Sequence, residues 1–361
     1  MCAQRLIDPL DGILARAQAG AATAIPLPRT ADEWQGWRPR VMAKVRAALG
    51  PWPEQVPLAA EEAERQDAGD HWRIKVLYDS DAFTTVPAWL LVPKGLREGE
   101  RRPALFCAHG HGRGKDELVG VFDPALSAEE RQRLEQRTRL NNLDYARLFV
   151  QRGYVCFVPD WRGFGERQAP AAWTRRSRDA CNVLAMAYGY LGFQLLALDI
   201  WDAMRGIDYL LARPEVDPER LGCVGLSFGG TMTTYLTALD ERIKAADIVC
   251  YLSTVRDDAL GMRGRANFCG TQFLRDLLTF GDISSIAGLI APRPLMAESG
   301  EQDDCFILED AKRCYQEVQQ IYAAAGAADR LQQEIFPGAH GFSGRLAFDF
   351  FARWLGPVSG E

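Results

Sequence analysis

Apolar residues along most of this chain come in short runs, and segments with helical spacing separate these runs. Each run is closed by Gly, Pro, Asp or Ser; the runs lie at 103–110, 153–161, 220–227, 245–253, 293–300 and 331–338. Between them, segments such as 191–214 and 309–326 repeat apolar residues at the spacing of a helix. Alternation of strand and helix predicts an α/β fold, with a mostly parallel central sheet and helices on both faces.

The N-terminal part of the chain has a different pattern. Residues 1–70 predict a helical and irregular leader, and its apolar residues at helical spacing are Trp34, Trp37, Val41, Val45 and Leu49. The stretch GPWPEQVP at 50–57 ends that helix and predicts a linker. Two strand-like segments, 72–80 and 86–95, then predict an antiparallel pair. We therefore divide the chain into a leader, residues 1–70, and one large α/β domain, residues 71–361.

Composition narrows the class of protein. The chain has 361 residues, of which 47% are hydrophobic and 25% charged, as is typical of a soluble globular protein. A net charge of −6 and the absence of a basic run argue against nucleic acid as a partner. We expect neither a signal peptide nor a membrane-spanning segment, because no apolar run is long enough. The nine cysteines are scattered without C-x-x-C spacing, which indicates reduced thiols and a cytoplasmic protein.

The strand-like run that ends at Ser227 carries the first candidate chemistry. The sequence Gly225-Leu226-Ser227-Phe228-Gly229 has the form G-x-S-x-G and leads directly into a helical pattern. In a nucleophile elbow of this form, the serine occupies a strained turn between strand and helix and exposes its hydroxyl. A plain glycine-rich turn has the same five residues, so the rest of the chain must decide between the two.

A serine nucleophile needs a base, and an acid that orients the base. The chain has four histidines, at positions 71, 109, 111 and 340, and only His340 follows Ser227. It lies in FPGAHGF, just after the last predicted strand. The acid should follow the strand 293–300, where the competing carboxyls are Glu298, Glu301, Asp303 and Asp304. We choose Asp303, because one short turn after Gly300 returns its carboxylate over the strand end. The order Ser227, Asp303, His340 is then that of α/β-hydrolases.

The oxyanion of a tetrahedral intermediate needs two N–H donors. Phe228 follows the serine and supplies the first, and the backbone of His111, in the turn His109-Gly110-His111-Gly112, supplies the second. Two alternatives exist for this turn. His109 and His111 could ligate a metal, although no third histidine lies nearby. The glycines could bind phosphate, although they match no phosphate-binding motif.

The fragment DWRGFGER follows the strand 153–161 and contains both an acid and a base. We expect Asp160 and Arg162 to form a buried ion pair that shapes the rim of the site; a plain turn is the alternative.

Together these motifs resemble the α/β-hydrolase superfamily. The order HGxG, D-x-RGFG, G-x-S-x-GG, APRP…G-x-x-D and PG-x-HGF looks most like its acetyl-xylan-esterase and dienelactone-hydrolase-like branch. The resemblance implies the α/β-hydrolase fold, with Ser227 as nucleophile, His340 as base and Asp303 as acid. It implies Phe228 and His111 as oxyanion donors. The chain has RGFG and GLSFGG where cephalosporin-deacetylase relatives have RGQG and GGSQGG, so the resemblance assigns ester hydrolysis but no particular substrate.

We therefore expect a serine carboxylesterase that hydrolyses short, acetyl-type esters of a small-molecule substrate through an acyl-enzyme. No cofactor or metal is expected, and a homo-oligomer is compatible with the sequence. The alternatives are a dienelactone-hydrolase-like or prolyl-oligopeptidase-like hydrolase, or a non-catalytic ligand-binding relative. The segment 254–292 is a candidate cap that brings Arg263, Arg265, Phe268, Phe273 and Phe280 towards the strand ends. These side chains either line a compact pocket, or the phenylalanines pack the segment against the sheet.

Overall fold

A computed structural model of the protein describes residues 8–22, 24–168, 180–256 and 268–358. In this part of the chain the centre is a nine-stranded sheet in the order β1-β2-β3-β5-β4-β6-β7-β8-β9. The strands are β1 (Glu61–Asp67), β2 (His71–Asp81), β3 (Thr84–Pro93), β4 (Arg102–Ala108), β5 (Val155–Pro159), β6 (Val216–Leu226), β7 (Ile243–Val249), β8 (Leu295–Gly300) and β9 (Leu331–Phe336). The pairs from β1 to β5 are antiparallel, and those from β5 to β9 are parallel. This mixed, mostly parallel sheet confirms the predicted fold class.

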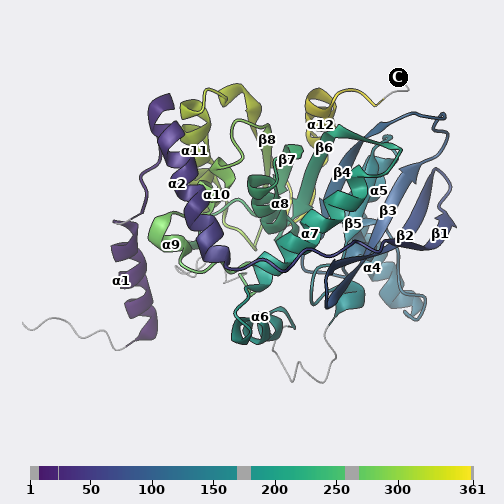
Figure 1. The fold of residues 1–361 in the computed structure, drawn as a ribbon, viewed down its shortest axis with the longest axis horizontal. Helices are drawn as coiled ribbons and strands as arrows, with labels where there is room; N and C mark the ends of the chain where they lie inside the picture. The colour runs from purple at the N-terminus through teal and green to yellow at the C-terminus, as the bar shows by residue number, and fades with distance from the viewer. Residues whose placement is uncertain (1–7, 23, 169–179, 257–267, 359–361) are drawn as a thin grey trace, which may run out of the picture.

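Helices cover both faces of the sheet. They are α1 (Pro9–Ala21), α2 (Ala31–Leu49), α3 (Lys115–Leu118), α4 (Ala128–Asn141), α5 (Tyr145–Val150), α6 (Ala180–Tyr190), α7 (Leu195–Leu211), α8 (Phe228–Leu239), α9 (Leu277–Phe280), α10 (Ile283–Gly288), α11 (Leu308–Ala324) and α12 (Ala347–Leu355). The near face in Figure 1 carries α7 and α8, and α5 and α12 lie behind the sheet. Two short 3₁₀ turns, Gly165–Arg167 and Ala328–Arg330, complete the described elements.

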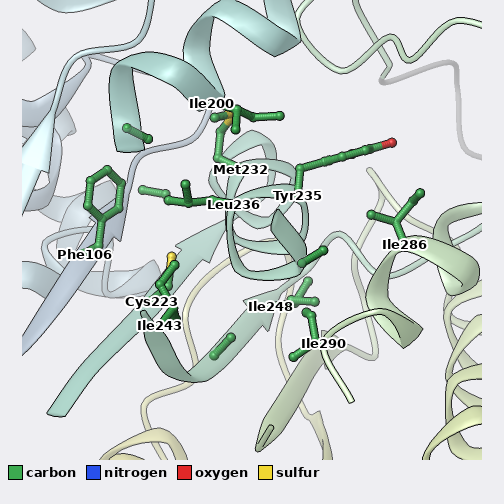
Figure 2. Packing of buried hydrophobic residues seen from close by; sticks show 14 of the residues in the cluster. Phe106, Ile200, Cys223, Met232, Tyr235, Leu236, Ile243, Ile248, Ile286 and Ile290 are labelled. Carbon is green, nitrogen blue, oxygen red and sulfur yellow. The ribbon is translucent and has the colours of Figure 1, made fainter. Parts of the chain in front are cut away.

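Each strand end is fixed by an apolar layer on either side. Along β4, Phe106 packs on the α7 and α8 side, whereas Leu105 and Cys107 face the α5 and α12 side. Figure 2 shows Met232 and Leu236 of α8 above the sheet. Burial on both faces explains why these strands read as continuous apolar runs, and it holds their carboxyl ends in one row.

Two parts of the N-terminal leader differ in how well the sequence predicts them. Helix α2 ends at Leu49 before Gly50, whose φ is +83°, and it buries Trp37. Strand β1 was not predicted, because its sequence EEAERQD has no apolar alternation. It pairs antiparallel with β2 at the edge of the sheet, where charged residues discourage further strand pairing.

The candidate cap 254–292 falls partly within the described residues. Phe280 is buried in the core, and Phe268 contacts Tyr251 and Phe306, whereas the Phe273 side chain is exposed. Arg263 and Arg265 lie outside the described residues. In this part of the segment, packing against the rest of the protein accounts for two of the three phenylalanines.

No single helix in the described ranges combines the length and apolar composition that a membrane crossing requires. Helices α6 and α7 meet this requirement only as a pair, and they are bent by 95° relative to each other.

Candidate active site

Ser227 lies between β6 and α8 in a conformation that few residues adopt. Its φ is +62° and its ψ is −119°, so its backbone is strained. Its N–H donates to the carbonyl of Val249 at 2.9 Å, and its carbonyl accepts from the N–H of Thr231 at 3.0 Å. The neighbouring strand and the first turn of α8 therefore hold the strained residue from both sides.

The glycines around Ser227 are required by close backbone contacts. A Cβ atom on Gly225 would lie 2.3 Å from the carbonyl oxygen of Gly229. One on Gly229 would lie 1.9 Å from the carbonyl oxygen of Ala108, at the end of β4. Helix α8 therefore starts against the ends of two strands, at a distance that only glycine allows. Of the two interpretations of the motif, the geometry favours the elbow over a plain turn.

His340 and Asp303 form the second part of the site. Nδ1 of His340 lies 2.9 Å from Oδ2 of Asp303, whose side chain is 2% exposed. The other oxygen, Oδ1, accepts hydrogen bonds from the backbone N–H groups of Cys305 at 2.7 Å and Phe306 at 3.2 Å. Asp304 is exposed. Among the competing acids, Asp303 is therefore the one that the structure brings to His340.

Electrostatics couple these two groups. Burial lowers the pKa of His340, but contacts with Asp303 and then with Cys250 and Cys305 outweigh it and raise the pKa overall. Burial likewise works to raise the pKa of Asp303, and the bond to His340 and the backbone donors lower it below its usual value. The pair therefore favours an ionised carboxylate that stabilises positive charge on the imidazole.

The loop that carries His340 is anchored on three sides. Gly338 accepts from the N–H of Gln302 at 2.8 Å, and the N–H of Phe342 donates to Asn141, at the end of α4, at 2.9 Å. The N–H of Ser343 donates to Oε2 of the buried Glu298 at 2.8 Å. Glu298, one of the competing acids, thus positions the loop.

Ser227 and His340 are brought to the same edge of the sheet. Ser227 bonds Val249, and the next residue, Cys250, donates its thiol to the carbonyl of Gly341 at 3.5 Å. No hydrogen bond within the described ranges joins the Ser227 hydroxyl to His340. Such bonds are often long before substrate binds, and they tighten in the complex.

The turn after β4 runs beside the elbow. A Cβ atom on Gly110 would lie 3.4 Å from Cβ of Ser227, and the ring of His111 lies 5.2 Å from that of Phe228, between centroids. Among the described residues, no acceptor is recorded for the backbone N–H of either Phe228 or His111. Both N–H groups lie at the turn beside Ser227 without a partner among the residues that the structure describes.

His109 has a structural environment. It is fully buried, and its Nε2 accepts from the N–H of Trp161 at 3.1 Å, so the proton lies on Nδ1, 2.8 Å from the carbonyl of Gly110. Burial lowers its pKa to about 4. Because both ring nitrogens are engaged, joint metal ligation by His109 and His111 does not fit this geometry. His109 instead ties the turn after β4 to the one after β5.

The predicted ion pair between Asp160 and Arg162 is wrong. Asp160 accepts from Nζ of Lys115 at 2.9 Å, whereas Arg162 donates to both carboxylate oxygens of Asp202, at 2.9 and 2.8 Å. Arg162 also donates to Asp81 at 3.1 Å. The two side chains leave the turn toward different elements, α3 and α7, and each finds its partner there. Both remain buried, and both fix the turn that carries Phe164.

Two buried residues near the elbow were missed from the sequence. Lys115 holds Asp160 and also contacts Glu166. The Tyr145 hydroxyl donates to the carbonyl of Ala108 at 2.6 Å and accepts from the N–H of Leu226 at 3.4 Å, which joins the ends of β4 and β6. The only signal for Lys115 is its place after HGHGRG, and nothing in the local sequence marks Tyr145.

Two cavities lie near the site. One, of about 600 Å³, has the polar lining residues His111, Arg113, Asp116, Asp123, Glu166 and Gln168 together with Phe164 and Cys181. The other, of about 510 Å³, is mostly apolar and is lined by Phe268, Phe273, Leu274 and Leu277 among others. Cys269 lines the apolar cavity, and contact with Cys181, against the effect of burial, lowers the pKa of its thiol to about 4.

Comparisons with known proteins agree with this geometry. Residues 138–348, more than half of the chain, match the model of the dienelactone hydrolase family. The Bacillus subtilis (strain 168) protein YtaP, assigned as a hydrolase, is 28% identical over 290 residues, which cover 78% of this chain and 86% of YtaP.

Solved structures share the fold at lower identity. A Bacteroides fragilis NCTC 9343 protein assigned as an acetyl xylan esterase has a TM-score of 0.74 and 18% identity, covering 92% of this chain and 83% of its own. A glucuronoyl esterase from Solibacter usitatus has a TM-score of 0.62 and 16% identity, covering 94% and 97%.

Proposed function

The chain belongs to the dienelactone hydrolase family and is a hydrolase, and we propose that it is a serine carboxylesterase with Ser227, His340 and Asp303 as its triad. The observation that carries this proposal is the strained Ser227 at the end of β6, at the same sheet edge as the His340–Asp303 pair. A non-catalytic relative would have no need to maintain that strain or to bury the carboxylate. The proposal places the reaction at one row of strand ends.

In the proposed reaction, Nε2 of His340 takes the proton of the Ser227 hydroxyl while the oxygen attacks the ester carbonyl. The resulting oxyanion accepts hydrogen bonds from the N–H groups of Phe228 and His111. Asp303 holds the proton on Nδ1 and stabilises the imidazolium. His340 then protonates the departing alcohol, the acyl group stays on Ser227, and water releases the acid by the same steps.

We further propose a small acyl group and a polar alcohol as the substrate. The 600 Å³ cavity begins at His111, and its charged lining suits hydroxyl groups on the alcohol side. The Bacteroides fragilis structural neighbour is assigned as an acetyl xylan esterase, and acetyl xylan is an ester of a small acyl group with a polar alcohol. The proposed location is the cytoplasm, since no two of the eight described cysteines form a disulfide. Small-molecule esters, rather than nucleic acids or membranes, are the proposed partners.

The test is hydrolysis of p-nitrophenyl esters of rising acyl length by wild type and Ser227→Ala. The variant should lose three orders of magnitude or more of kcat, roughly, because it has no nucleophile. Ser127→Ala, which removes a surface serine at the start of α4, is the control and should retain wild-type kcat. A folded Ser227→Ala protein with near-normal kcat would refute the nucleophile.

The acyl series tests the substrate class separately. Acetyl and butyryl esters should give the highest kcat/KM if the acyl group is small. A maximum at octanoyl or beyond would refute the small-acyl proposal, and it would leave Ser227 as nucleophile unaffected.

A further inference from the structure

Three side chains with metal-binding atoms meet beside the proposed oxyanion turn. They come from separate segments: His111 from the turn after β4, Cys181 from the first turn of α6, and Cys269 from the chain before α9. One nitrogen and two sulfur atoms all lie within 4.8 Å of one another. Nε2 of His111 is 3.1 Å from Sγ of Cys269. The imidazole and the two thiols take no part in the bond-making steps of the proposed ester hydrolysis.

We propose that His111, Cys181 and Cys269 form a site for a thiophilic divalent cation, best represented by zinc, and that its occupancy inhibits the esterase. Imidazole and thiolate are the ligands that zinc prefers, and one histidine with two cysteines leaves a fourth position open. Ligand atoms around a tetrahedral zinc lie about 3.5–3.8 Å apart, given bond lengths of about 2.0–2.3 Å. The observed spacing needs only small side-chain adjustments to reach this range.

The surroundings hold the ligands in place before any ion binds. The His111 ring packs against the rings of Phe164 and Phe228, with centroids 5.3 and 5.2 Å away. Cys181 is buried on α6. The backbone of Gly270, next to Cys269, packs against the backbone of Cys181, since a Cβ on Gly270 would lie 3.2 Å from the Cys181 carbonyl oxygen. The ligand set therefore sits on packed segments that lie side by side.

Inhibition follows from the position of His111, and this part rests on the proposed function. The same residue would supply the oxyanion N–H from its backbone and a metal ligand from its ring. His111 and Cys181 both line the 600 Å³ cavity that we assign to the alcohol portion of the ester. An ion held there, with a water at its open position, would occupy the space of the substrate and raise KM.

A second group of potential ligands, Cys250, Asp303 and His340, is also within 4.8 Å of one another. Its members belong to or touch the proposed triad, so zinc bound there would also inhibit. The test must therefore tell the two sites apart, and Cys269 allows this because it lies in only one of them.

Binding is measured first, without reference to activity. The full chain, reduced and freed of metal with a chelator, is titrated with zinc by calorimetry and with cobalt(II) by absorption spectroscopy. We expect one equivalent of either ion, and a thiolate-to-cobalt charge-transfer band in the near ultraviolet. Cys181→Ser and Cys269→Ser should each weaken zinc binding by about 100-fold or more, since ligand loss costs more than loss of an outer partner. Cys314→Ala removes a core thiol of α11 itself and should leave zinc binding unchanged.

Inhibition is then measured with p-nitrophenyl acetate. Zinc should raise KM over the same concentration range in which it binds, and a chelator should restore activity. Cys269→Ser should hydrolyse the ester at the wild-type rate and lose its sensitivity to zinc. The Ser227→Ala protein should still bind one zinc, so a failure of the proposed triad would not be mistaken for a failure of the site.

Three results would overturn the proposal. One is no zinc binding at micromolar concentration, and another is equal binding by wild type and both serine variants. The third is zinc inhibition that persists in Cys269→Ser, which would place the inhibiting ion outside this cluster. If the first of these results is obtained, loss of two thiols under mild oxidation would identify the cluster as a disulfide site instead.

Discussion

Asp303→Asn is the substitution that separates the proposed role of this side chain from its packing. The amide keeps the size of the carboxylate, and its oxygen can still accept from the N–H groups of Cys305 and Phe306. Its NH₂ group would then face Nδ1 of His340, where the carboxylate oxygen now lies at 2.9 Å. The imidazole would have to carry its proton on Nε2, and it could no longer accept the proton of Ser227.

The magnitude follows from this change of tautomer. In the well-studied serine proteases the corresponding change lowers kcat by about 10⁴-fold, which corresponds to about 5 kcal/mol of transition-state stabilisation. We expect a loss of that order here, because the Asp303 side chain is 2% exposed and contacts Nδ1 of His340 in the same way. Asp304→Asn is the matched control, since the next side chain is exposed, and kcat should stay within about a factor of two.

The assay is kcat for p-nitrophenyl acetate at saturating substrate, with thermal unfolding of each variant to show that it is folded. A folded Asp303→Asn protein that retains more than a tenth of wild-type kcat would refute the reasoning. Equal losses in Asp303→Asn and Asp304→Asn would refute it as well.

Three further substitutions test the surroundings of the site. Gly229→Ala would place a methyl 1.9 Å from a backbone oxygen and should lower the free energy of unfolding in urea by about 3 kcal/mol or more. The control Gly36→Ala places its methyl in open space on α2 and should leave this free energy unchanged or raise it slightly. Equal effects of the two substitutions would contradict the close contact at Gly229. Arg162→Met should destabilise the protein by about 3–5 kcal/mol, because Asp202 keeps its buried charge and loses a partner. A loss of stability below about 1 kcal/mol would contradict this reasoning. Burial raises the pKa of Asp247 to about 7, so the wild-type protein loses stability as the pH rises from about 4 to 7. The free energy of unfolding of Asp247→Asn, relative to wild type, should therefore be about 2–3 kcal/mol higher at pH 8 than at pH 5. An equal difference between variant and wild type at the two pH values would count against this pKa.

The sequence predicted those parts of the fold and site that depend on local patterns. The strands from β4 to β9 were predicted from short runs of apolar residues, and the elbow from its five residues together with the order Ser227, Asp303, His340. Asp303 could be chosen because the turn after Gly300 is short. Strand β1 was missed, since a charged edge strand has no apolar face to reveal it.

Contacts between distant segments could not be predicted in this way. Arg162 and Asp160 lie two residues apart, yet their partners Asp202 and Lys115 are 40 and 45 residues away. Proximity in sequence suggested an ion pair that tertiary packing replaced. The same holds for Tyr145, whose hydroxyl joins two strand ends, because only the folded sheet brings those ends together.

The most direct test of the account is covalent capture of the nucleophile. Wild-type protein is treated with a fluorophosphonate, and the modified residue is located by peptide mass spectrometry, with Ser227→Ala and His340→Ala treated in parallel. The account predicts one adduct, on Ser227, that forms far more slowly in His340→Ala and is absent from Ser227→Ala. An adduct on any other residue of the wild-type protein, or labelling that persists in Ser227→Ala, would contradict it.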